Sequence, residues 1–253
     1  MTDPLLAVRR PTIAIGTITP SANVVVERVT AAVLADFPMV SAHFSRTEVV
    51  GSSDAYADDY DWTGMLRAAE LLAHAHPSCI CWNGSKGGSI GFAVDRTLCD
   101  RITGMTGIPS VTSTLAIDAA LRATKATRVA LVTPYRSAYA AKIPPVFADA
   151  GYAVVAEAHA GVADNLAYAA IPDGDIVAMV RSVATVRPDA VIAYCTNFPV
   201  AHLVDALERE IDIPVYDSVT AGVWGALGTA GQPTAPGRRW GSLFELSVAP
   251  GDA

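Results

Sequence analysis

The sequence has few charged residues and no long apolar run, and these shortages exclude several classes of protein. Charged residues make up 17% of the 253 positions and hydrophobic residues 51%, which is the balance of a compact globular enzyme and not of a disordered chain. The net charge of −7 argues against a partner with a phosphate backbone, so no nucleic-acid binding is expected. No stretch reaches the roughly 18 consecutive apolar residues of a membrane helix, so no membrane partner is expected.

The sequence also lacks a leader pattern and a metal-ligand pattern. Residues 1–7 carry no basic segment ahead of an apolar run, so no secretory signal is predicted and a cytoplasmic location is expected. The five histidines show no ligand spacing, and the four cysteines lack the paired CxxC spacing of a zinc site. We therefore expect no metal and four free thiols, namely Cys79, Cys81, Cys99 and Cys195.

What the sequence does contain is two strand-like segments that each lead into small polar residues next to a cysteine. Residues 191–197 read Val-Ile-Ala-Tyr-Cys-Thr-Asn, and residues 79–85 read Cys-Ile-Cys-Trp-Asn-Gly-Ser. Cys81 and Cys195 are 114 positions apart, and the same offset relates the Thr-Pro pairs at 19–20 and 133–134. The Ile-Pro pairs at 108–109 and 213–214 are only 105 apart, which predicts nine extra residues after Cys81. We interpret the chain as two similar halves that face each other with one thiol each.

Strand-like and helix-like segments alternate through both halves. This alternation predicts an α/β fold of two quasi-repeated domains, each a parallel sheet flanked by helices, with binding groups at the carboxyl ends of the strands. The helical segments at 115–123 and 218–228 correspond, and by quasi-symmetry each is expected to cross to the opposite half. The predicted domains are therefore residues 10–114 plus 219–253 and residues 115–218. Residues 241–248 are predicted to form a terminal strand or an extended arm.

The two strand-end cysteines are the candidate catalytic residues. A lone buried cysteine is usually an inert small hydrophobe. Two thiols at equivalent strand ends fit reactive cysteines better, because the backbone amides of a helix that starts after each one can lower the thiol pKa. The repeat thus favours a catalytic pair, Cys81 and Cys195.

Several uncharged side chains accompany the thiols in predicted loops. Turn chemistry and helix capping explain such residues as well as function does, and Ser21 or Asn23 is expected to cap the helix that begins near residue 26. The functional alternative is that a carboxylate or a developing enolate needs neutral hydrogen-bond donors around it. On that alternative the substrate-binding set is Pro20, Ser21, Asn23, Asn83, Ser85, Tyr135, Asn165, Thr196 and Asn197.

These residues together resemble the Asp/Glu racemase superfamily, in particular its maleate cis-trans isomerase and arylmalonate decarboxylase branch. The resemblance runs from about Thr12 to Gly228 and rests on Gly16–Asn23 with Glu27, Cys81, Thr133-Pro134-Tyr135, Asp164-Asn165 and Cys195. It implies two flavodoxin-like domains with a cleft between them and no metal or organic cofactor. It further implies that Asn23, Tyr135 and Asn165 hold substrate carboxylates.

The resemblance leaves the reaction open between alternatives. In the isomerases, Cys81 as thiolate would add to the double bond of a maleate-like acid and Cys195 would protonate the neighbouring carbon. The decarboxylases use only the thiol matching Cys195 and have glycine where this chain has Cys81, so Cys81 favours isomerase or racemase chemistry. The segment Trp82–Ser85 departs from both patterns and leaves the substrate unsettled.

The leading prediction is a cofactor-independent cis-trans isomerase of a small unsaturated dicarboxylate, of the maleate to fumarate type. The alternatives are a racemase or arylmalonate-type decarboxylase of the same superfamily, or a non-catalytic protein that binds small carboxylates and can dispense with its thiols. The expected partner is a small carboxylate substrate. The oligomeric state is left open, with a homodimer as one candidate.

Overall fold

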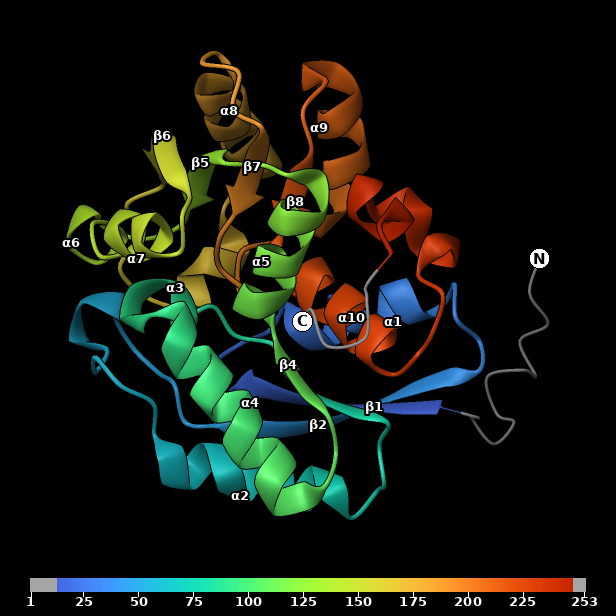
Figure 1. The fold of residues 1–253 in the computed structure, drawn as a ribbon. Coiled ribbons are helices and arrows are strands. Elements are labelled where there is room, and N and C mark those ends of the chain that lie inside the picture. The colour runs from blue at the N-terminus through green and yellow to red at the C-terminus, as the bar shows by residue number, and fades with distance from the viewer. Residues whose placement is uncertain (1–12, 248–253) are drawn as a thin grey trace.

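The computed structural model describes residues 13–247, which form two four-stranded parallel sheets with helices around them (Figure 1). The first sheet has the order β2-β1-β3-β4 and the second the order β6-β5-β7-β8. The repeated order confirms the predicted pair of α/β units, which we call the first and second halves. Their strands are β1 (Ile13–Pro20), β2 (Val40–Thr47), β3 (Cys79–Trp82) and β4 (Ser110–Thr112), then β5 (Arg128–Thr133), β6 (Ala153–His159), β7 (Ala190–Ala193) and β8 (Val215–Asp217).

Helices connect the parallel strands, as crossovers between such strands require. The first half contains α1 (Val26–Leu34), α2 (Trp62–Ala73), α3 (Gly87–Ile90) and α4 (Phe92–Thr106). The second half contains α6 (Ser137–Ala140), α7 (Ile143–Asp149), α8 (Asp173–Ala184) and α9 (Val204–Ile211). Short 3₁₀ turns are η2 (Ser53–Ala55), η3 (Leu166–Ala170), η4 (Ala201–Leu203), η5 (Ala235–Trp240) and η6 (Ser242–Glu245).

Two further helices, α5 (Ser113–Thr124) and α10 (Ser218–Thr229), lie between the sheets (Figure 1). Both are buried along most of their length and pack against each other, and a Cβ placed at Gly225 would come within 2.8 Å of the Ala116 Cβ. Although α10 follows the second sheet, it packs on β3 and β4 of the first, which is the crossover expected for this helix. The domain boundaries themselves stay a prediction.

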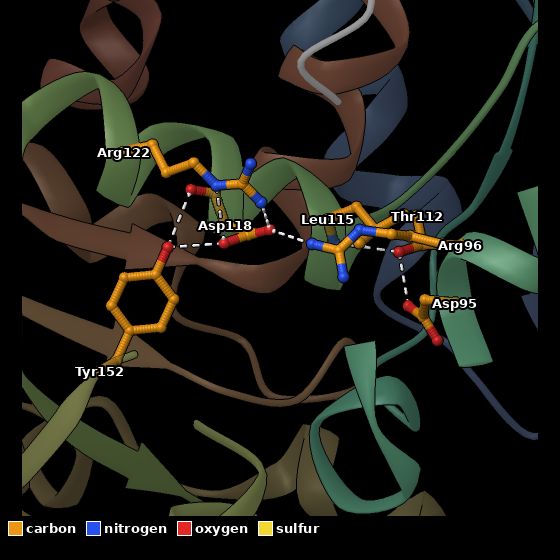
Figure 2. A network of polar contacts seen from close by, with 7 residues as sticks. All are labelled: Asp95, Arg96, Thr112, Leu115, Asp118, Arg122 and Tyr152. Carbon is orange, nitrogen blue, oxygen red and sulfur yellow. Dashed lines mark hydrogen bonds and ion pairs between the residues drawn. The ribbon is translucent and has the colours of Figure 1, made fainter. Parts of the chain in front are cut away.

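A buried carboxylate, Asp118 of α5, holds together elements from both halves (Figure 2). Its side chain forms ion pairs with Arg96 of α4, at 2.9 Å, and with Arg122 one turn further along α5. The hydroxyl of Tyr152, which precedes β6, donates to the same carboxylate over 2.6 Å. A buried charge is stable only when it is paired in this way, so the contact fixes α5 between α4 and the second sheet.

The C-terminal prediction was wrong within the described residues. Residues 242–245 form the turn η6 and no strand, and residue 248 lies outside the described part. Trp224 of α10 donates its indole N–H to the Leu246 carbonyl, so the segment is held against the helix and pairs with neither sheet. The leader prediction for residues 1–7 also lies outside the described residues. No helix between residues 13 and 247 is long and apolar enough to cross a membrane.

Candidate active site

The strand registers correct the proposed equivalence of the two cysteines. Ile18 of β1 pairs with Trp82 of β3, and Val132 of β5 pairs with Ala193 of β7. Ile18 and Val132 are 114 positions apart, but Trp82 and Ala193 are only 111 apart. Three of the nine extra residues in the first half therefore precede the end of β3 and do not follow it. The shared offset of 114 relates the first strands of the halves and does not relate the strands that carry the cysteines.

When the two sheets are matched by these registers, the residue of the first half that corresponds to Cys195 is Gly84 and not Cys81. Cys195 and Gly84 each lie two positions beyond the end of their strand, whereas Cys81 lies inside β3, level with Ile192 of β7. Successive side chains of a strand point to opposite faces. Cys81 therefore faces α10, where its thiol donates to the Gly222 carbonyl over 3.5 Å. In the described structure the two predicted thiols therefore do not face each other across one site.

One cavity of about 400 Å³ lies at the carboxyl ends of the strands and is lined by residues of both halves. Most of the predicted site residues line it, which brings together side chains up to 177 positions apart along the chain (20 to 197). Three predicted residues, Ser21, Cys81 and Asn83, do not line it. Those that do are Pro20, Asn23, Ser85, Tyr135, Asn165, Cys195, Thr196 and Asn197.

Cys195 contributes a protonated thiol to the cavity. Burial raises the pKa of Cys195 to about 12, and hydrogen bonds from the Tyr135 hydroxyl and the Asn197 backbone N–H oppose that rise. The expected lowering of the thiol pKa by a following helix was wrong, because a turn follows β7 and the next helical residues are those of η4. Burial raises the pKa of Cys81 well above its ordinary value as well.

Uncharged side chains join the two halves beside this thiol. The side-chain amide oxygen Oδ1 of Asn23 accepts from the backbone N–H groups of Val25 and Val26, both at 2.8 Å, so Asn23 caps the turn that begins α1. Its amide also donates to the Thr196 hydroxyl at 3.2 Å. Asn197 accepts from the Val24 N–H at 2.9 Å. Capping and site assembly are thus performed by the same side chains.

Two hydroxyl groups form a second donor pair in the cavity. Ser85 Oγ lies 3.1 Å from the Tyr135 hydroxyl oxygen, and Tyr135 also hydrogen-bonds the sulfur of Cys195. Burial raises the pKa of Tyr135 well above its ordinary value, so this phenol stays protonated and able to donate. The arrangement offers neutral O–H donors within reach of the thiol, as a developing oxyanion requires.

The two predicted binding residues outside the cavity have structural partners instead. Asn83 donates to the Val219 carbonyl at 3.2 Å and accepts from the Ser113 hydroxyl at 3.0 Å, so it joins the first residues of α5 and α10. Ser21 exchanges hydrogen bonds with the backbone of Val49, at 3.0 and 3.3 Å. Turn and helix chemistry accounts for the observed contacts of these two residues.

A lid, which we define as residues 47–61, also lines the cavity and was not predicted from the sequence. Many cavity-lining residues come from this segment, including Tyr56 and Tyr60. The lid belongs to the first half but is held to the second by an antiparallel bridge between Ser52 and Asp164. Ion pairs from Arg136 and Lys142 to lid carboxylates strengthen this attachment. The acidic and aromatic composition of residues 53–62 is typical of a loop, and no local pattern indicates that the segment reaches the cavity.

Comparison with known proteins shows that the chain belongs to a known enzyme family. The arylmalonate decarboxylase family model matches residues 16–244. A maleate isomerase of Nocardia farcinica is 30% identical over 232 residues, which cover 87% of this chain and 91% of that protein.

Solved structures agree with these matches. A Nocardia farcinica maleate cis-trans isomerase, in a cysteine-to-serine mutant with a covalently bound succinylcysteine intermediate, superposes with a TM-score of 0.79 at 28% identity, covering 92% of this chain and 98% of that one. A structure of arylmalonate decarboxylase superposes with a TM-score of 0.75 at 22% identity and covers 92% and 99% of the two chains, which shows a shared fold.

Proposed function

The chain is an enzyme of the arylmalonate decarboxylase family, and from this premise we propose that it decarboxylates a substituted malonate with Cys195 as the only thiol in its site. The observation that carries the proposal is the strand register, which sets Gly84 level with Cys195. The resemblance noted in the sequence assigns one thiol and a glycine to decarboxylases and two thiols to isomerases. The described cavity therefore offers the one-thiol pattern, whereas the 30% identity to a maleate isomerase supports the isomerase prediction.

The geometry supports proton donation by Cys195. Loss of carbon dioxide from a malonate leaves an electron pair on the α-carbon, and this pair is delocalised into the remaining carboxylate as an enediolate. The hydroxyl groups of Ser85 and Tyr135 can donate to that enediolate where its negative charge develops. The Cys195 thiol then gives its proton to the α-carbon and is reprotonated by water. A thiol with a pKa of about 12 holds its proton at neutral pH, as this role requires.

A substrate comparison tests the proposal. Phenylmalonate is expected to lose carbon dioxide and give phenylacetate, which can be followed by proton NMR. Maleate, incubated in parallel, is expected to give little or no fumarate. Turnover of maleate without turnover of any substituted malonate would contradict the proposal.

Cis-trans isomerisation of maleate is the second candidate, and the 30% identity to a maleate isomerase favours it. With Cys81 outside the cavity, Cys195 would itself have to add to the double bond as a thiolate. Because burial raises the pKa of Cys195 to about 12, the thiolate fraction increases about tenfold per pH unit below that value. The rate of isomerisation by this route would therefore increase about tenfold per pH unit between pH 7 and 9. The rate of a reaction in which the thiol donates its proton would not increase in this way.

A further inference from the structure

We infer that the substrate carries an additional anionic group on its side chain and that Lys86 binds this group. The inference rests on the proposed function and narrows its substrate class. Two parts of the cavity wall differ in charge. Near Cys195 the wall offers uncharged donors, whereas Lys86 is the only lysine, arginine or histidine among the cavity-lining residues that the structure describes.

The charge of Lys86 has no carboxylate partner. No ion pair within residues 13–247 includes Lys86, and the hydrogen bond of its Nζ goes to the main-chain carbonyl of Asp59. Partial burial and, to a smaller extent, the like charge of Lys142 lower the pKa of Lys86, and the charges of Asp59 and Asp58 oppose that shift. These two carboxylates act on Lys86 without a direct ion pair, so an anionic ligand group in contact with its Nζ would be stabilised in the cavity.

The acidic residues of the cavity wall do not fill this role. Asp59 accepts from the Tyr60 N–H at 2.7 Å and from the Trp62 indole at 3.1 Å. Asp61 accepts from the Gly64 N–H at 3.0 Å as the N-cap of α2. The third, Glu48, is exposed to solvent. Two of the three carboxylates are thus engaged in local structure.

Lys86 is placed to contact the substrate's side chain and not the carbon that reacts. The Lys86 Nζ lies 5.9 Å from the centre of the Tyr60 ring, which packs edge to face against Trp82. Ser85, one residue earlier, is instead directed at Tyr135, beside Cys195. Neighbouring residues therefore serve different parts of the cavity, with hydroxyl donors near the thiol and a cation near the aromatic wall.

Binding of two unreactive ligands by isothermal titration calorimetry tests the inference without turnover, so that its failure is separate from a failure of the decarboxylase proposal. Phenylacetate carries one negative charge, and 4-carboxyphenylacetate carries a second at the far end of its ring. We expect wild type to bind the second ligand more tightly. Lys86→Met should reduce that preference about tenfold or more, because charged hydrogen bonds are the stronger kind. Lys86→Arg should restore most of it.

Lys142→Met is the matched control. Lys142 also contacts the lid, through Asp58, and lies 5.9 Å from a tyrosine ring, but it does not line the cavity. This variant should keep the wild-type preference between the ligands. The inference is overturned if wild type binds neither ligand, or binds both equally. It is also overturned if Lys86→Met weakens the binding of both ligands to the same degree, or of neither. The same holds if Lys142→Met has the same effect as Lys86→Met.

Discussion

The turn that carries Cys195 determines the surroundings of its thiol. This turn places the sulfur beside the Asn197 N–H, at 3.3 Å, and beside the Tyr135 hydroxyl, in a cavity that the lid helps to line. Cys81 is as deeply buried but is directed at the backbone of α10. Two residues of the same type thus have different chemistry because one follows a strand and the other lies within it.

The protonation state of Cys195 predicts the pH dependence of the reaction. Burial raises the pKa of Cys195 to about 12, so the proton-donating form is fully populated at lower pH and is lost only as the pH rises through that value. We expect the Cys195 thiol to produce no change in kcat for decarboxylation between pH 6 and 9, measured in buffers of constant ionic strength. A kcat that increases tenfold per pH unit in this range would indicate a thiolate mechanism instead.

At the scale of elements, the end of β3 has no room for a second thiol. A Cβ placed at Gly84 would lie 2.2 Å from the ring of Trp82, so the indole occupies the space that a side chain at 84 would need. We expect Gly84→Cys to lower the free energy of unfolding by about 1–3 kcal/mol, as overpacking of a core does. Urea unfolding followed by circular dichroism measures this.

The control for that variant is Gly104→Ala. Gly104 lies inside α4, and a Cβ there would meet nothing within 4 Å. Alanine should raise the free energy of unfolding by about 0.5–1 kcal/mol because it is the better helix former. Equal stability of Gly84→Cys and wild type would show that Trp82 does not restrict this position.

The start of α10 predicts a pH-dependent stability. Asp217 caps this helix by accepting from the Thr220 N–H at 2.8 Å, and burial raises the pKa of Asp217 to about 7. The native state therefore binds more protons than the unfolded state between about pH 4 and 7, and this group's contribution to stability falls as the pH rises through that window.

Asp217→Asn keeps an oxygen for the cap and removes the titration. We expect wild type to lose stability relative to this variant between pH 5 and 8, by no more than about 3 kcal/mol. Urea unfolding at the two pH values measures the difference. If the free energies of unfolding of wild type and Asp217→Asn differed by the same amount at both pH values, the raised pKa of Asp217 would be contradicted.

At the scale of the whole molecule, the cavity exists only because the two halves are held together. Asn23 donates to Thr196 across the boundary, and the lid joins the second half through Ser52 and Asp164. The crossed helices α5 and α10 add a buried layer between the sheets. A cavity built from two halves in this way is typical of sites at domain interfaces.

Much of this architecture was predictable from the sequence, and the features that were not predictable share a physical cause. Alternating strand and helix patterns and the repeated Thr-Pro pairs predicted both sheets and the crossing of α10. The level of Cys81 was not predictable, because three extra residues precede β3 and strand register depends on pairing partners that the sequence does not display. Lys86 and the lid were missed because tertiary contacts, and no local pattern, bring them to the cavity.

The most direct test of the single-thiol account compares Cys195→Ser with Cys81→Ser. Both variants replace a buried thiol with a hydroxyl, but only Cys195 lines the cavity. Phenylmalonate would be incubated with each variant in deuterium oxide, and the α-carbon of the phenylacetate product examined by NMR. We expect Cys81→Ser to form product with one deuterium at that carbon at a rate near that of wild type, and Cys195→Ser to lose at least about a hundredfold in kcat. Full activity in Cys195→Ser, or loss of activity in a folded Cys81→Ser, would contradict the account.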